Sequence, residues 1–242
     1  MEPFVLFLAV AVVLVGGILA TRPLRDRRRV KDIAEWADMN GWEPAEARSD
    51  PELPGRWQGG PFLQGVPLPA TDVLYGEVSG HRMISFTHTW RTGTAESRFS
   101  RKRHAHVVVL DEEPAEPRLE LTPEGWRDKL QKAFGGQDVQ VGNPAFDDAW
   151  RVRASDDDFA RRVLDPRFMS MLMLPDFQST RIRVDGPSVL VWTAGRTSAE
   201  NLAQLSTRLV DVARLTVPLE KGQPVFEQGG DIDLPGMGFE KI

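Results

Sequence analysis

The sequence contains no cysteine, so disulfide bonds, cysteine-bound zinc and thiol catalysis are excluded. It also lacks the motifs G-x-S-x-G, G-x-x-x-x-G-K-[ST], H-E-x-x-H and G-x-G-x-x-G. These motifs mark serine hydrolases, P-loop nucleotide-binding proteins, zinc proteases and dinucleotide-binding folds, respectively. We therefore expect no cofactor of these classes.

Long apolar runs are scarce, and one segment stands apart from the rest. Residues 4–20, FVLFLAVAVVLVGGILA, carry no charge, and as a helix they would span roughly 26 Å, close to the ~30 Å hydrocarbon core of a bilayer. We predict a single transmembrane helix over 4–20. The alternative is a cleaved secretory signal, but such signals carry Lys or Arg before the apolar run, and here the only charge there is Glu2.

A basic segment, residues 21–31, follows this run immediately. Basic residues close to a span are retained on the cytoplasmic side, so the pattern predicts a single-pass protein of the cell membrane with a cytoplasmic domain. Anionic lipid headgroups attract such residues at about 1 kcal/mol each. The predicted membrane-surface contacts are Arg22, Arg25, Arg27, Arg28, Arg29 and Lys31.

Positive charge is otherwise in the minority. After Lys31 there are 24 of the 30 Lys and Arg but 33 of the 35 Asp and Glu, a formal charge of −9. Bulk charge of this sign does not favour nucleic acid. One further basic run, Arg98 to Arg103, interrupts the acidic part; if it lies on the same side as the juxtamembrane segment, both can hold the domain against anionic lipid.

Residues 32–218 have the patterns of an α+β domain with an antiparallel sheet packed with several helices. Residues 30–41 show helical periodicity ending at Gly41, and 43–70, with six prolines and four glycines, predict an irregular connection. Alternation predicts strands over 73–78, 81–90 and about 99–110. A tight turn at Ser79-Gly80 joins the first two, and the acidic, proline-containing segment 111–117 is predicted as a loop.

The second half mixes helices and strands. Thr122 and Pro123 have the character of a helix start, and Gly135 of its end. A short strand is predicted over 149–155, helices over 155–165 and 167–175, and a hairpin turning at Asp185-Gly186. Capping boxes at Ser155/Asp158 and Thr197/Glu200 predict helix starts. Residues 219–242 are predicted to form a flexible tail.

The histidines are the main candidates for chemistry. All four lie between His81 and His106. Alternation along a strand places His104 and His106 on one face, and an antiparallel neighbour can bring His88 near, which would allow one zinc ion to bind His88, His104 and His106. The simpler interpretation is that they are solvated or edge residues, because no carboxylate stands at a fixed spacing from them.

One passage carries a family resemblance. Residues 146–169, FDDAWRVRASDDDFARRVLDPRFM, resemble a pattern in uncharacterised bacterial single-pass membrane-anchored proteins of a domain-of-unknown-function family. In that pattern a strand leads to A-S/x-D, a helix ending in L-x-P, a hairpin and a terminal helix. The resemblance implies a fold and an anchor, and it transfers no catalytic residue.

Together these features predict a non-enzymatic binding or scaffolding module at the cytoplasmic face of the membrane. Its expected partners are the lipid bilayer, anionic headgroups and a protein not yet identified. The alternative is a membrane-tethered, metal-dependent enzyme that uses the three histidines. The two differ in one geometric requirement, because the enzyme needs His88, His104 and His106 to converge in a pocket.

Overall fold

A computed structural model of the protein describes residues 24–46, 49–57, 59–62, 64–93, 100–124 and 138–216. For residues 111–114 it describes the backbone alone. Its centre is an antiparallel sheet of seven strands in this part of the chain, arranged in the order β1-β3-β4-β5-β6, with β2 on β3 and β7 on β5. The strands are β1 (Glu43–Pro44), β2 (Ser49–Asp50), β3 (Val66–Val78), β4 (His81–Thr92), β5 (Arg101–Pro123), β6 (Trp150–Ala154) and β7 (Arg181–Ala194).

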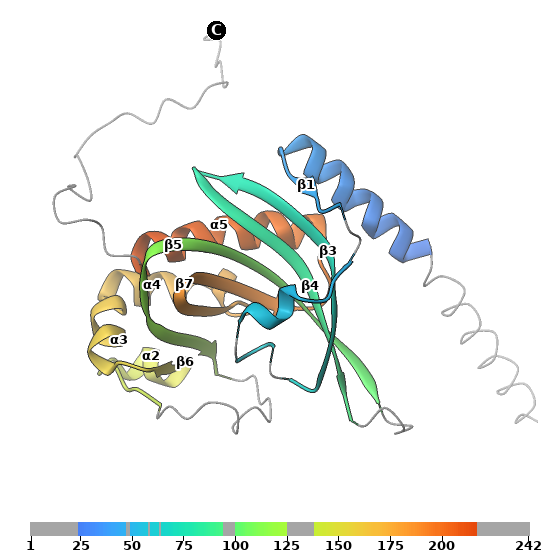
Figure 1. The fold of residues 1–242 in the computed structure, drawn as a ribbon. Coiled ribbons are helices and arrows are strands. Elements are labelled where there is room, and N and C mark those ends of the chain that lie inside the picture. The colour runs from blue at the N-terminus through green and yellow to red at the C-terminus, as the bar shows by residue number, and fades with distance from the viewer. Residues whose placement is uncertain are drawn as a thin grey trace, which may run out of the picture.

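Helices cover one face of this sheet (Figure 1). A helix over residues 24–39, called here the N-terminal helix, lies at the β1–β3 edge, and α5 packs along β7 and β5. The bounds of α5 are Ala199–Thr216, and the other helices on this face are α2 (Pro144–Ala149), α3 (Asp157–Val163), α4 (Pro166–Leu172) and η2 (Pro175–Phe177). The short helix η1 (Leu53–Arg56) lies on the opposite face, where Leu53 joins a second core. The α+β class and the antiparallel sheet are as predicted.

The alternation of side chains along the strands produces two cores. Val108 and Leu110 of β5 face the helices, whereas Val107 and Val109 face the opposite side. The second core is closed by the proline-rich connection, whose Trp57 packs on Phe86 with ring centroids 5.8 Å apart. The sheet is therefore apolar on both faces over much of its area, and the irregular connection covers one of them.

The β3–β4 turn forms as predicted. Ser79 and Gly80 have φ angles of 53° and 84°, and two consecutive positive φ angles are typical of the two-residue turn that matches the twist of a hairpin. Val78 and His81 are paired on either side of it. This local signal was sufficient because the turn depends only on the residues within it.

Several predictions were wrong because pairing between distant strands overrides the local preference of the sequence for a loop, turn or helix. Residues 111–117 belong to β5, which runs on to Pro123, so Thr122 pairs with Arg151 and begins no helix. The predicted hairpin at Asp185-Gly186 is a bend within one strand, because β7 pairs with β5 on both sides of it. The rest of the helix predicted from Thr122 to Gly135 lies within residues 125–137, outside the described residues.

Helix starts also shift by one or two positions. Asp156, not Ser155, caps α3 by accepting hydrogen bonds from the backbone N–H of Asp158 and Phe159. At the start of α5 the Ser198 hydroxyl accepts a hydrogen bond from the backbone N–H of Asn201 at 3.2 Å. The hydroxyl of the buried Thr197 instead lies 2.9 Å from the Thr87 hydroxyl. The helix α2, which the sequence analysis missed, begins after an Asn143 cap and a Pro144 at its first position.

Among the described residues, none of the helices has both the length and the apolar character needed to cross a membrane. The predicted span at 4–20 and the predicted tail at 219–242 lie outside the described residues.

Candidate functional site: a groove beside the N-terminal helix

The N-terminal helix rests on the edge of the sheet through a short apolar face. Ile33 and Ala37 are buried in the same core as Leu74 of β3. The helix is followed by Gly41 at φ 68°, a conformation that glycine adopts without strain, and by the buried Trp42. The Trp42 ring lies so close to Gly76 of β3 that a Cβ there would overlap it.

A groove of about 570 Å³ remains between this helix and the sheet edge. Its size lies within the range of ligand pockets, about 300–1,000 Å³. The walls are mostly apolar, with polar groups from Asp38, Thr71 and Asp72. The apolar lining comes from Val30, Ile33, Ala34 and Ala37 of the helix, from Trp42, Pro44 and Ala45 after it, and from Val73 and Leu74 of β3.

Asp72 lines the groove and ties the helix to the sheet. Its Oδ2 accepts a hydrogen bond of 2.9 Å from Arg29 and its Oδ1 one of 3.2 Å, and the Thr87 hydroxyl donates to Oδ2 at 2.8 Å. Arg29 also donates to the carbonyl oxygen of Thr197 at 2.8 Å. Burial alone would lower the pKa of Arg29, but the bonds and charge of Asp72 outweigh it and the pKa is raised.

A second ion pair links the helix to the loop between β7 and α5. Arg196 Nη1 lies 2.7 Å from Asp26 Oδ1, and Arg29 Nε lies 3.1 Å from the same oxygen. Burial tends to raise the pKa of Asp26, but these two arginines lower it overall. Asp26, Arg29, Asp72 and Arg196 therefore form one connected cluster, called here the helix clamp.

The predicted membrane-contact residues divide into two sets. Arg25, Arg27, Arg28 and Lys31 are exposed on the N-terminal helix. Arg29 is different, because only 17% of its side chain is exposed and its charge is paired with Asp72. Arg22 is outside the described residues.

The three histidines of the predicted zinc site do not come together. Thr87 pairs with His106, His88 with Ala105 and Thr89 with His104, so His88 faces the opposite side of the sheet from the other two. His88 stacks on Trp90 at 5.4 Å between ring centroids. Within the described residues no group of three His, Asp or Glu side chains is placed to hold a metal ion.

The buried His106 and the half-buried His104 instead form hydrogen bonds with hydroxyl groups of β4. His106 Nε2 is 2.8 Å from the Ser85 hydroxyl, and His104 Nδ1 is 2.9 Å from the Thr89 hydroxyl. Desolvation lowers the pKa of His106 to about 3 and that of His88 to about 4, so both rings are neutral at neutral pH. The arrangement does not favour the metal-dependent enzyme.

The sequence analysis did not identify Asp72, Thr197 or Trp42 as site residues. Asp72 is a single acid inside a strand, and its partner Arg29 is 43 positions away. A weak signal was available at Gly76, a glycine within an otherwise regular strand, because such a glycine often marks the close approach of another group.

Comparisons with known proteins give a fold and no family assignment. No family model matches the sequence, and no curated protein matches it. A solved structure, described as the crystal structure of the mycobacterial trehalose monomycolate transport factor A, TtfA, is similar with a TM-score of 0.58 and 18% identity. The match covers 80% of this chain and 98% of that one. At this identity the similarity establishes the shared fold.

Proposed function

We propose that the protein is a non-enzymatic accessory factor in lipid transport, attached to the membrane by residues 4–20 and binding the apolar chain of a lipid in the groove beside the N-terminal helix. The groove is the observation that carries the proposal. It is apolar, of ligand size, and formed by a helix that follows the apolar run within a few residues. The similar structure, named for the transport of a trehalose-bearing lipid, supports the same class of function.

The chemistry of the groove suits an alkyl chain better than a polar metabolite. Of the two acids that line it, Asp72 is already bound by Arg29 and Thr87 and Asp38 is exposed to solvent, so neither is a buried charge that a polar ligand would have to neutralise. Val30, which lines the groove, is 50% exposed. Covering such surface gains about 0.8 kcal/mol for each buried methylene of a bound chain.

A photocrosslinking experiment on the full chain in lipid nanodiscs tests the groove. A lipid with a diazirine at the end of its acyl chain is expected to label peptides containing residues 30–38 and 71–74. Ala34 lines the groove and is exposed, so Ala34→Phe fills the space with little disturbance. Labelling of these peptides should fall about tenfold, the change produced by ~1.4 kcal/mol of lost binding.

Glu35→Phe is the matched control, since Glu35 is exposed on the same helix and does not line the groove. It should leave the labelling unchanged. Crosslinks confined to residues 4–20, or equal labelling in wild type and Ala34→Phe, would contradict the proposal.

Membrane attachment and orientation have their own test. The cysteine-free chain permits single cysteines at Ser49 and Ser170, both exposed. With the domain in the cytoplasm, a membrane-impermeant thiol reagent should label neither position in intact cells and both after lysis. Labelling in intact cells would place the domain outside and refute this part of the proposal.

A further inference from the structure

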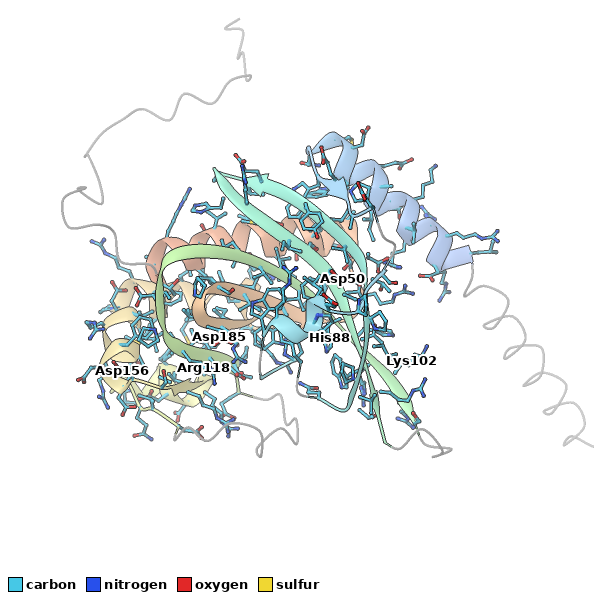
Figure 2. All side chains as sticks on the ribbon, in the orientation of Figure 1. Asp50, His88, Lys102, Arg118, Asp156 and Asp185 are labelled. Atoms are coloured by element: carbon cyan, nitrogen blue, oxygen red, sulfur yellow. The ribbon has the colours of Figure 1, made fainter. Side chains whose placement is uncertain are left out.

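The start of the N-terminal helix lies on the same side of the molecule as the end of the β4–β5 hairpin where Thr92 pairs with Arg101 (Figure 1). The loop after β7 connects them: the Gly195 N–H donates to the His104 carbonyl oxygen at 3.0 Å, and the next residue, Arg196, pairs with Asp26 of the helix. Arg29 reaches the carbonyl oxygen of Thr197 in the same loop. Figure 2 shows Lys102 on the arm of the hairpin that projects beyond the body of the domain.

These segments carry an excess of exposed positive charge. Arg101, Lys102 and Arg103 are exposed on the hairpin. On the helix, Arg25, Arg27 and Arg28 are exposed as well. In residues 24–30, 91–93, 101–104 and 195–198, Asp26 is the only acid, and the clamp arginines already neutralise it.

The charges act on a common region. Burial is the main reason that the pKa of His104 is lowered; Arg196, Lys102 and Arg29 lower it further, and Asp72 opposes them. A histidine on the hairpin therefore experiences the clamp arginines together with its own strand neighbour. The exposed basic side chains of these two regions are called here the basic face, on a domain whose formal charge after Lys31 is −9: Arg25, Arg27, Arg28, Arg101, Lys102 and Arg103.

We propose that the basic face docks the domain on a bilayer of anionic phospholipid, with the β4–β5 hairpin as a contact separate from the N-terminal helix. This rests on the proposed membrane attachment and adds a fixed orientation to it. The ion pair Arg196–Asp26 and the Gly195–His104 hydrogen bond tie the helix and the hairpin to the same loop, so they keep a fixed relation to each other. Basic side chains near an anionic surface act together within a Debye length of about 8–10 Å.

A membrane fits the basic face better than a nucleic acid does. Single-stranded nucleic acid is held by exposed aromatic side chains among the basic ones. Among the large apolar side chains exposed in the described part of the chain, Tyr75 is the only aromatic, and it pairs with Glu43 at the β1–β3 edge. Leu24, by contrast, is 62% exposed at the start of the helix, next to the apolar run.

The test measures the distance of the hairpin from the bilayer in the full chain. A single cysteine at Thr92 in the hairpin carries an environment-sensitive fluorophore, and the nanodiscs contain a headgroup spin-labelled lipid that quenches nearby fluorophores. Quenching should be several-fold stronger with phosphatidylglycerol than with phosphatidylcholine alone. A cysteine at Ser170, exposed on α4, is the distant reporter and should show little quenching in either lipid.

Charge reversal shows whether the basic face is responsible. The triple variant Arg101→Glu, Lys102→Glu, Arg103→Glu should reduce quenching at Thr92 to the phosphatidylcholine value, and the Gln counterparts should give an intermediate value. The matched control reverses three exposed arginines on α3 and α4, namely Arg161, Arg162 and Arg167. It should leave the quenching unchanged.

Three results would overturn the inference: equal quenching at Thr92 and Ser170, quenching at Thr92 that ignores lipid charge, or quenching that survives the triple Glu variant. If that variant keeps its quenching but no longer crosslinks to another membrane protein in cells, the basic face is a protein interface instead. If the full chain fails to enter neutral nanodiscs at all, the proposed attachment fails too. Entry with an unquenched hairpin refutes only the docking.

Discussion

At the scale of single residues, Asp72 combines an unusual backbone conformation with the contacts that hold the N-terminal helix. Its φ of 54° is a left-handed conformation that costs a non-glycine residue of order 1–3 kcal/mol, and asparagine and aspartate tolerate it best. In this conformation its carboxylate reaches Arg29, Thr87 and the more distant Arg196. The strained backbone is thus offset by the bonds that hold the N-terminal helix.

Asp72→Asn keeps the shape and the tolerance for positive φ but removes the charge. We expect a loss of about 1.5–3 kcal/mol in the free energy of closing the helix onto the sheet, the value of hydrogen bonds to charged groups. Amide hydrogen exchange in residues 29–39 should accelerate while that of α5 stays constant. Asp32→Asn, at an exposed position of the same helix, should change exchange little, and equal effects of the two variants would refute the role of the clamp.

Burial of neutral histidine makes stability depend on pH. The pKa of His106 is lowered to about 3 by desolvation, with Asp72 raising it and Arg29 lowering it to a smaller extent, whereas an unfolded histidine has a pKa near 6.5. Between these values the unfolded chain binds the extra proton. The contribution of His106 is therefore fully present above pH ~6.5 and is lost progressively as the pH falls towards 3.

The expected result is a lower urea midpoint at pH ~4.5 than at pH ~7, with a smaller decrease in His106→Gln, because glutamine keeps a partner for Ser85 and does not titrate. Urea unfolding followed by tryptophan fluorescence measures both. An unchanged pH dependence in His106→Gln would show that His106 does not contribute to the acid lability.

At the scale of elements, the N-terminal helix is positioned by two different contacts. The helix clamp is ionic and lies at its first turns, whereas Trp42 beyond its end is apolar and packs on Gly76. The groove lies between these two points. Because each contact fixes one end, loosening either should open or tilt the groove without unfolding the sheet.

Gly76→Ala tests the apolar end of this arrangement. The added Cβ overlaps the Trp42 ring, so Trp42 must move, and overpacking of this kind costs about 1–3 kcal/mol. We expect a lower unfolding midpoint and altered near-ultraviolet circular dichroism from the tryptophan. Gly55→Ala, where a Cβ meets nothing within 4 Å, is the control and should stay within about 0.5 kcal/mol of wild type.

At the scale of the whole molecule, the N-terminal helix takes part in two surfaces of different character. The groove is mostly apolar, and the basic face is charged and exposed. Binding at the two surfaces should respond differently to salt concentration. Screening shortens the reach of exposed charges, to about 3 Å at 1 M, but does not weaken the burial of apolar surface.

Raising the salt concentration from about 0.05 M to about 0.5 M should therefore reduce quenching at the Thr92 reporter, because exposed charges are screened. Photocrosslinking in the groove should remain at its low-salt level. Both readings can be taken on the same nanodisc preparation. A parallel loss of the two signals would mean that lipid binding in the groove depends on the docking of the basic face.

Three features predicted from a few consecutive residues form as expected, because no long-range pairing opposes them. Ser79-Gly80 forms its turn, Ile33 and Ala37 occupy the buried face of a helix, and Trp150–Ala154 is a strand. Each depends on local backbone preference or on the period of apolar residues. The span at 4–20 and the cytoplasmic orientation stay predictions, since they depend on residues outside the described ranges.

The sequence by itself determined the α+β class, the antiparallel meander and the separation of a basic N-terminal segment from an acidic domain. Only the tertiary structure decided that β5 continues through Pro117, that His88 points away from His104 and that Arg29 pairs with Asp72. The reason is physical: strand register and ion pairs join residues far apart in the chain, and their free energy comes from burial that exists only after folding.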